Sequence, residues 1–473
     1  MKDKRMAVVM AVLMITFIGF GIIIPVMPEI IQAADPKEAE LHTGRMLALY
    51  SAISFLLSPV WGRLSDRLGR RPIILAGLVG FAASFLLFGL SSDSLTLMYL
   101  SRAIGGLFSG AVASVIVAYV ADITPPEKRT KGMGLVGMSI GLGFTFGPGF
   151  GGLLSVISLE TPFYAASALA LVTFVLALVK LKESTTPEQR SRKPEQKASR
   201  WTAFQGPLKY LYVLAFFVTF TLAGMEATLQ FFGMQRFDVT PLQVGLLFFV
   251  CGLVGALVQG GVVRRRVKKG EEPKYIVIGL LVSALGFFML LFAHSLWWAT
   301  LSLAVFGIGN ALIRPCVTSL ITQKTKVGQG VASGLSSSMD SLGRIAGPLL
   351  GSFLFTVEMG LPYLLGGILC VAALLLVVRF RQLDRQDAAE EKPVAETVTM
   401  NNVVGEEART PKRKHSEVHG WFGVIGAGAP TIAMGGGLNL GISVGSERWS
   451  FTTDFRLAGQ SFNKPAALAL TIC

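Results

Sequence analysis

Four charged side chains lie deep inside apolar stretches of this sequence: Glu226, Arg102, Arg314 and Asp340. A charge in such surroundings is costly unless it is paired or hydrated, so each is a functional candidate by default. Burial disfavours the ionised form of a carboxyl group, so Glu226 is suited to take up a proton from one side and surrender it on the other. A cationic compound would compete with the proton for this carboxylate. The alternative role is a structural hydrogen bond to a neighbouring helix.

The charges near position 340 leave two interpretations open. Asp340 and Arg344 are four residues apart, so on a helix they share one face. They either neutralise each other or take part in a proton relay. Arg314 has no acid in its own stretch and would pair with Glu226 or Asp340 from another helix.

The apolar residues are gathered in long blocks, which requires a membrane-spanning fold. Of the 473 residues, 52% are hydrophobic and 15% are charged. A helix needs about 20 apolar residues to cross a bilayer, whose core offers no water to an open backbone. We expect an all-α membrane protein with twelve spans at 6–31, 44–61, 73–90, 95–120, 131–157, 162–180, 207–232, 241–262, 275–293, 296–320, 329–356 and 361–380.

The net charge is +14, and the basic residues are concentrated in alternate loops. The loops expected on the side of the N-terminus hold 29 Lys and Arg, and those on the other side hold three. This is the positive-inside pattern, so we expect both termini in the cytoplasm and no binding of nucleic acid. The four cysteines and four histidines show no spacing typical of a disulfide framework or a metal site.

The chain contains two related halves. A shift of 200 residues matches six identical residues, among them Gly147-Pro148 with Gly347-Pro348. Parallel repeats imply a pseudo-twofold axis along the membrane normal and a cavity between the halves, which rocking would open to each side in turn. We expect a six-helix bundle at 1–181, a cytoplasmic linker at 182–206, a second bundle at 207–382 and a cytoplasmic tail at 383–473. The tail is expected to be disordered, and is either an extension of this protein or a translated frame unrelated to it.

One loop after the second expected span carries a specific motif, Gly62-Arg63-Leu64-Ser65-Asp66-Arg67-Leu68-Gly69-Arg70-Arg71. It resembles the signature loop of the major facilitator superfamily, and the resemblance extends over roughly residues 6–382. Gly62 would let two helices approach closely, and Asp66 would pair with a neighbouring arginine. The resemblance implies that this charged set, with Asp122 at the end of the fourth span, latches the cytoplasmic side. Simple positive-inside anchoring would explain the arginines alone.

Small residues recur through the fifth expected span. Gly143, Gly147, Pro148, Gly151 and Gly152 resemble the antiporter motif of the drug exporters within the superfamily. Small residues four apart allow close packing of helices, and a proline bends its helix. Such a seam would seal one end of the cavity and suppress uncoupled leak; ordinary close packing is the alternative.

The first span carries Gly19-Phe20-Gly21-Ile22-Ile23-Ile24-Pro25-Val26-Met27-Pro28-Glu29. This run resembles the first helix of the drug:proton antiporters of Gram-positive bacteria and, more distantly, of the tetracycline exporters. Thr16 stands where the tetracycline group has an acid, and no carboxylate lies between Pro72 and Asp93. These departures favour a multidrug pump. The resemblance also assigns Glu226 to the acidic position of the seventh span, and Arg102 to a buried arginine that tunes nearby protonation.

Aromatic rings close to the expected cavity are candidate contacts for flat, hydrophobic cations. They are Phe17, Phe20, Phe144, Phe146 and Phe306. Taken singly, each ring is as consistent with packing between helices.

These features predict proton-coupled efflux of small hydrophobic, often cationic compounds by a monomer in a bacterial plasma membrane. The proton gradient would drive it, without a cofactor and without enzymatic activity. The alternatives are an exporter of one narrow substrate (tetracycline, a sugar or a metabolite) and a non-transporting membrane receptor or scaffold. The sequence holds no G-x(4)-G-K-[ST] loop for nucleotide phosphates, so an ATP-driven pump or a membrane enzyme is not expected.

Overall fold

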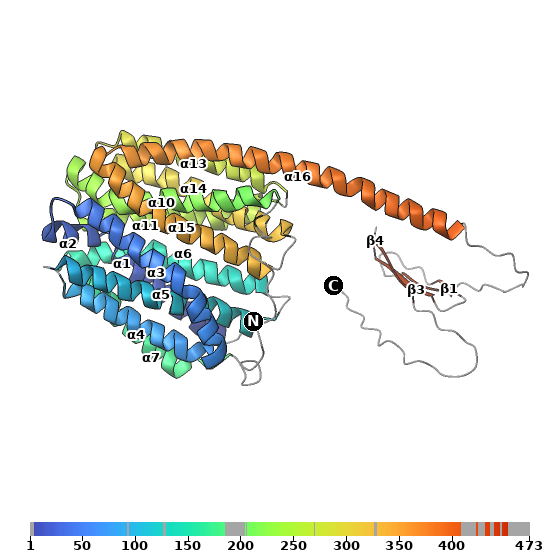
Figure 1. Ribbon diagram of the computed structural model, residues 1–473, viewed down its shortest axis with the longest axis horizontal. Coiled ribbons are helices and arrows are strands. Elements are labelled where there is room, and N and C mark those ends of the chain that lie inside the picture. The colour runs from blue at the N-terminus through green and yellow to red at the C-terminus, as the bar shows by residue number, and fades with distance from the viewer. Residues whose placement is uncertain are drawn as a thin grey trace, which may run out of the picture. The chain divides into compact units, whose positions relative to one another are not determined.

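The structure is a computed structural model that describes residues 4–91, 94–125, 129–184, 204, 206–268, 270–325 and 329–407, and four strands further on. It divides into two units, Met1–Glu390 and Glu391–Cys473. The first unit holds the helices that carry the candidate site (Figure 1).

The first bundle begins with a broken helix. The expected span at 6–31 is divided into α1 (Lys4–Ile22) and α2 (Met27–Ala34). Pro25 and Pro28 explain the break, because proline cannot donate the backbone hydrogen bond that a continuous helix needs. The rest of the bundle consists of α3 (Ala39–Leu68), α4 (Arg70–Gly89), α5 (Leu95–Ile123), α6 (Arg129–Ser155) and α7 (Thr161–Lys180).

The second bundle repeats this order of helices. Its elements are α10 (Leu208–Phe237), α11 (Pro241–Leu257), the π-helix η2 (Val258–Val263), α12 (Arg264–Arg266), α13 (Glu272–Leu291), α14 (Leu296–Lys324), α15 (Gln329–Val357) and α16 (Leu361–Glu407). Side-chain caps fix several helix starts, since the first N–H groups of a helix lack partners within it. Ser94 caps α5, Ser295 caps α14, and Thr240 forms a capping box with Gln243 at α11.

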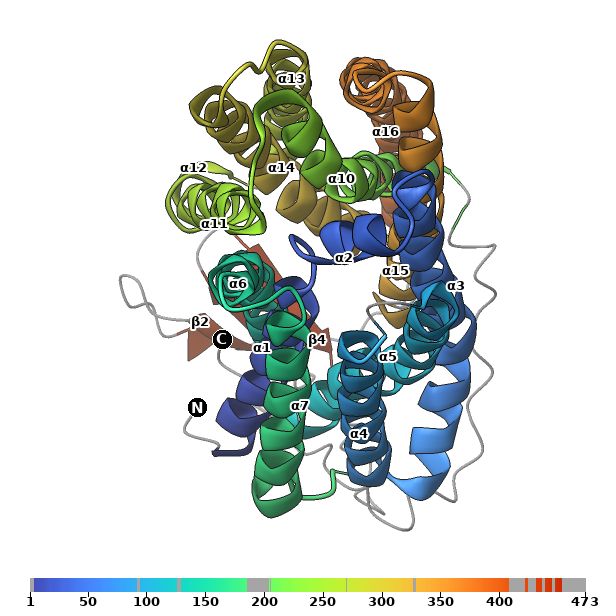
Figure 2. The same cartoon turned by 90° about the vertical axis from the view of Figure 1, so that its left-hand side faces the viewer.

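The expected all-α membrane fold is confirmed. Among the described residues, eleven helical segments are long and apolar enough to cross a membrane, with α1 and α2 counted as one. The helix that does not meet this measure is α15, whose 29 residues include the polar run Ser336–Ser341. In Figure 2, which looks along the helices, α1–α7 and α10–α16 form two neighbouring groups.

Close glycine packing repeats in the two bundles. In α6, a Cβ atom built on Gly147 would lie 2.7 Å from the Cα atom of Gly21 in α1. In α15, a Cβ atom built on Gly351 would lie 2.9 Å from the Cα atom of Gly224 in α10. The fifth long helix of each half therefore packs on the first, as the shift of 200 residues predicts.

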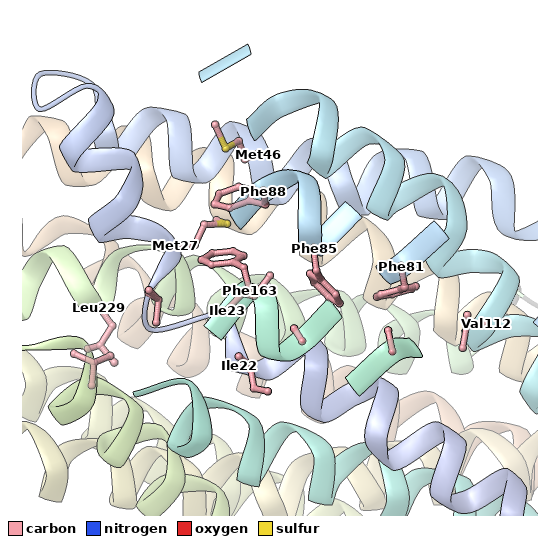
Figure 3. Close-up of a cluster of buried hydrophobic side chains, with 14 of the residues drawn as sticks. Ile22, Ile23, Met27, Met46, Phe81, Phe85, Phe88, Val112, Phe163 and Leu229 are labelled. Carbon is pink, nitrogen blue, oxygen red and sulfur yellow. The ribbon is translucent and has the colours of Figure 1, made fainter. Parts of the chain in front are cut away.

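The core of the first bundle is aromatic. Phe88 of α4 stacks on Phe163 of α7 with ring centroids 4.4 Å apart, and Phe81 and Phe85 lie on the same side of α4 (Figure 3). All four are at most 3% exposed. This core holds α4 and α7 together behind the helices that line the cavity.

The tail contains regular secondary structure. Helix α16 continues past residue 380 to Glu407. The second unit also contains an antiparallel sheet of β1 (Phe422–Gly423), β2 (Thr431–Gly435), β3 (Asn439–Val444) and β4 (Glu447–Thr452), paired in sequence order. Most of the expected linker lies outside the described residues.

Candidate functional site

A cavity lies between the two bundles, with an empty volume of about 620 Å³ including its mouth. Its walls come from α1, α2, α3 and α5 in the first bundle and from α10 and α15 in the second. Three lining residues are charged: Arg102, Glu226 and Arg344. Most of the others are apolar or aromatic, among them Phe20 and Tyr50. Apolar walls with a few polar groups are typical of sites for small molecules.

The two bundles meet at the end of the first unit that holds α2, which we call the α2 end. There, a Cβ atom built on Gly44 of α3 would lie 2.6 Å from the carbonyl oxygen of Pro348 in α15. A Cβ atom built on Gly152 of α6 would lie 2.9 Å from the Cα atom of Leu242 in α11. Contacts this short leave no room for side chains, so this end of the cavity is closed.

The opposite end holds the loop 62–71 and the three arginines of α12, and we call it the basic end. Glycines of the same interfacial helices there would have no atom within 4 Å of an added Cβ: Gly62 of α3, Gly134, Gly137 and Gly141 of α6, Gly260 and Gly261 of η2, and Gly334 of α15. In the most apolar stretches of Ala39–Leu68 and Pro241–Arg266, only 6% of the residues are buried. The bundles therefore stand apart toward the basic end.

Glu226 forms an ion pair within the cavity. Its Oε2 atom lies 3.9 Å from Nη1 of Arg344, and both side chains are mostly buried. The guanidinium carbon of Arg344 also lies 5.3 Å from the ring centroid of Phe144 in α6, a distance typical of a cation–π contact. Arg344 thus links the acid of one bundle to the antiporter helix of the other.

Asp340 belongs to a separate cluster. Its Oδ1 atom lies 3.8 Å from Nη2 of Arg314 and accepts a 2.6 Å hydrogen bond from the Thr219 hydroxyl. Arg314 also donates to that hydroxyl over 3.2 Å. Asp340 and Arg344 therefore do not neutralise each other: successive turns of α15 point them at different partners. Arg314 was expected to pair with Glu226 or Asp340, and in the structure it pairs with Asp340.

Arg102 of α5 is buried and lines the cavity. The residue is 2% exposed, and its guanidinium carbon lies 4.6 Å from the ring centroid of Phe88 and 5.9 Å from that of Phe85. Nη2 is 3.5 Å from the Ser101 hydroxyl, and Nε has no hydrogen-bond partner among the described residues. A cation held mainly by aromatic rings therefore stands in the wall of the cavity that also holds the Glu226–Arg344 pair.

The five candidate rings separate into two groups. Phe17, Phe20 and Phe144 form a cluster, with centroids 5.4 Å apart for Phe17 and Phe144 and 5.5 Å apart for Phe20 and Phe144. Phe146 instead points to α11, 5.8 Å from Phe249, and Phe306 is buried against Phe287 of α13 at 4.9 Å. Of the five candidate rings, Phe20 is the one that lines the cavity. Phe17 and Phe144 pack around it, and Phe146 and Phe306 pack elsewhere because α6 and α14 contribute no side chain to the lining.

The antiporter glycines lie on two faces of α6. Gly143, Gly147 and Gly151 pack on α1, where a Cβ atom on Gly143 would lie 2.5 Å from Cβ of Phe17. Gly152 packs on α11 at the α2 end, and an added Cβ on Gly245 of α11 would contact the carbonyl oxygen of Pro148. The motif therefore builds both the inner packing of the bundle and the seal between bundles.

Arg70 is the centre of the loop 62–71. It is 9% exposed and lies 2.7 Å from Asp66 and 3.1 Å from Asp122. Gly69 makes this geometry possible because its φ of 104° is readily accessible only to glycine. Arg67 is exposed, and Arg71 donates to the carbonyl oxygen of Leu178. The expected close approach at Gly62 is not found, because the bundles are apart there.

Glu183 is a partner that sequence reasoning missed. Its carboxylate accepts hydrogen bonds from the backbone N–H groups of Arg70 and Arg71, at 2.9 and 3.1 Å. A carboxylate at a helix N-terminus is favourable for both the unpaired N–H groups and the helix dipole. No local signal marks this contact, because Glu183 is more than a hundred residues away from its partners.

Ionisable groups also gather between α2 and α3. The pKa of Asp35 is held below its usual value, chiefly because its carboxylate accepts a hydrogen bond from the backbone N–H of Lys37. The N–H of Glu38 and the nearby His42 act in the same direction. His42 lies 3.4 Å from Asp35 and 2.9 Å from the hydroxyl of Tyr99. The described residues contain no cluster of three His, Cys, Asp or Glu side chains suited to a metal ion.

Comparisons with known proteins match most of the chain. The family model of the Major Facilitator Superfamily matches residues 9–329 and, in a second match, residues 268–444. Multidrug resistance protein 2 of Bacillus subtilis (strain 168) is 30% identical over 381 residues, which cover 79% of this chain and 94% of that protein. Quinolone resistance protein NorA of Staphylococcus aureus is 29% identical over 384 residues, 80% of this chain and 97% of the relative.

Two solved structures share the fold of this chain. The human organic anion transporter MFSD10 (TETRAN) has a TM-score of 0.61 at 26% identity, over 79% of this chain and 98% of that one. A bacterial homolog to the human lysosomal transporter Spinster, in an inward-facing and occupied conformation, has a TM-score of 0.59 at 17% identity, over 81% of this chain and 94% of that one. The second similarity shows the fold alone.

Proposed function

The chain belongs to the major facilitator superfamily, and we propose that it exports small hydrophobic compounds of several kinds in exchange for protons. The observation that carries this proposal is the Glu226–Arg344 pair, held at 3.9 Å inside a cavity that is closed at one end. The relatives named for multidrug and quinolone resistance support efflux of more than one compound.

Coupling follows from competition for Glu226. A carboxyl group in this cavity either binds a proton or remains ionised, paired with Arg344 or with a cationic group of a substrate. A proton and a cationic substrate group exclude each other because they neutralise the same charge. Each half-cycle then carries one of them across the membrane, which is antiport.

The lining accepts charges of both signs. Two guanidinium groups and one carboxylate face the space, beside the rings of Phe20 and Tyr50. This set is broader than the cationic preference expected from Glu226 alone, and it suits flat amphipathic compounds with either charge. An exporter of sugars would need more polar side chains in these walls, because each buried hydroxyl of a sugar requires a hydrogen-bond partner.

Alternating access follows from the two interfaces. The contacts at the α2 end would open, and the glycines at the basic end would come together, when the bundles rock. The positive-inside pattern supports a cytoplasmic basic end, so the described conformation faces the cytoplasm. The Arg70 cluster would then act as a cytoplasmic latch. We further infer a bacterial plasma membrane, a monomer, cytoplasmic termini, and no cofactor beyond the proton gradient.

Transport in cells tests the proposal. Expression should lower the accumulation of ethidium, a protonophore should abolish the effect, and Glu226→Gln should remove it while the folded protein remains in the membrane. Glu358→Gln, which changes an exposed acid between α15 and α16, is the matched control and should transport normally. Full efflux by Glu226→Gln would overturn the role of this acid.

A scaffold with this fold is the second candidate. It would signal through the tail, so deletion of residues 388–473 should abolish its function. A pump should retain dye efflux after the same deletion, because the cavity and both interfaces lie within residues 4–386. Loss of efflux in the truncated protein, with normal amounts in the membrane, would contradict the export proposal.

A further inference from the structure

Gln230 is a buried amide whose hydrogen-bonding groups are unused. The residue is 2% exposed, and neither its Nε2 nor its Oε1 atom has a hydrogen-bond partner among the described residues. Buried amide groups without partners are rare in folded proteins because each costs free energy. A side chain of this kind is therefore available to a partner that this conformation does not supply.

The nearest ionisable neighbour along the helix is Glu226. Gln230 follows it by four residues on α10, in the direction of the α2 end. Residues at this spacing share one helix face, with Cβ atoms about 5–6 Å apart. Thr228 is on a different face, where it donates to the hydroxyl of Tyr363. The Glu226 side chain can therefore reach the Gln230 amide by rotation about its own bonds.

We propose that Glu226 exchanges partners when it binds a proton: the carboxylate pairs with Arg344, and the protonated acid pairs with Gln230. A carboxylic acid has one donor and one acceptor, and a glutamine amide offers both complements. An arginine offers donors only, so it favours the ionised form. This inference rests on the proposed role of Glu226 as the proton carrier, and it makes Gln230 a positioning residue.

The charged and titratable groups around Glu226 include three arginines, two acids, a tyrosine and a cysteine. Arg344 of α15, Arg314 of α14 and Arg102 of α5 are cations that carry donors only. Asp340 is held by Arg314 and Thr219. Tyr50 of α3 lines the cavity, and the partly buried Cys251 lies on α11. On α2 the ionisable residue is Glu29, itself an acid.

The exchange connects protonation to the interface between bundles. Arg344 contacts Glu226 in its own bundle and the ring of Phe144 in the other. When Glu226 turns to Gln230, Arg344 loses its counter-charge and the cavity gains an unpaired cation. Proton binding thus changes the charge at the interface between the two bundles, which must move during transport.

Infrared difference spectroscopy of the purified protein tests this inference directly. The C=O stretch of a protonated carboxylic acid appears as the pH is lowered, and Glu226→Gln identifies the band of this acid. Gln230→Met keeps the length of the side chain and removes the amide. We expect the band to move to higher frequency, because the acid loses its hydrogen bond. The titration midpoint should fall by about 0.5–1 pH unit, the equivalent of one hydrogen bond.

Thr228→Val is the matched control, since it removes a buried polar group of α10 on another face. It should leave the frequency of the C=O band and the titration midpoint unchanged. Loss of packing alone would likewise leave the midpoint unchanged, so a shift in Gln230→Met reports loss of the amide. An unchanged band in Gln230→Met would overturn the partner exchange and leave Glu226 as the proton carrier. If Glu226→Gln removes no band at any pH, the proposed coupling itself fails.

Discussion

The packing of α6 on α1 predicts different effects of the same substitution at two glycines of one helix. In Gly147→Ala, the new methyl group would lie 2.7 Å from the Cα atom of Gly21 and 2.8 Å from the carbonyl oxygen of Ile18. Both are backbone atoms, so α1 and α6 must move apart. In Gly141→Ala, on the same helix, the methyl group meets nothing within 4 Å.

The difference between the two variants isolates the packing contribution. Alanine is favoured over glycine within a helix by about 0.5–1 kcal/mol, and this gain is common to both sites. Overpacking costs about 1–3 kcal/mol and applies only at Gly147. Gly147→Ala should therefore be less stable than Gly141→Ala by about 1–3 kcal/mol, and less stable than the natural protein if the cost exceeds the helical gain.

Thermal unfolding of the purified protein in lipid nanodiscs measures this difference. Gly141→Ala should unfold at or above the temperature of the natural protein, and Gly147→Ala should unfold below Gly141→Ala. Equal unfolding temperatures would refute the close approach of α1 and α6 on which the first bundle depends.

Three further predictions concern charged groups. Arg70→Ala should lower the free energy of unfolding by about 1–2 kcal/mol, because charge-assisted hydrogen bonds are lost at a partly exposed site. Arg67→Ala should change it by no more than about 0.5 kcal/mol, and thermal unfolding compares the two variants. Asp340→Asn and Arg314→Gln should each impair dye efflux. If the pair is structural, the double variant should recover part of the efflux. An inactive double variant favours a proton relay through Asp340. The lowered pKa of Asp35 adds stability above its usual pKa of about 4, which is lost as the pH falls through the lowered value; Asp35→Asn should remove this acid-dependent part of the unfolding curve.

The order of the helices and the packing of the two bundles were predictable from apolar blocks and from the internal repeat. The twelve apolar blocks predicted the long helices, and the matched Gly-Pro pairs at 147–148 and 347–348 predicted equivalent packing in the two bundles. The pairing of Asp66 with an arginine was likewise predicted, because both lie in one short loop. Local spacing carries this information directly.

Contacts between distant segments were not predictable in the same way. Pairing of Arg344 with Asp340, one turn away, was one of two interpretations that the sequence left open. In the structure Arg344 pairs with Glu226, because helix packing decides which face of α15 meets α10. The positions of Phe146 and Phe306 depended on the same unknown rotations. Glu183 follows α7 and carried no local signal of its contact with α4.

The exclusion of proton and substrate at Glu226 is the central claim, and proton release on binding measures it most directly. Ethidium would be added to purified protein in weakly buffered solution, with a pH indicator present. We predict that binding releases protons at a pH where the free protein holds them, and that Glu226→Gln, matched by Glu358→Gln as a control, abolishes the release. Binding of ethidium to the natural protein without any release of protons would contradict the claim.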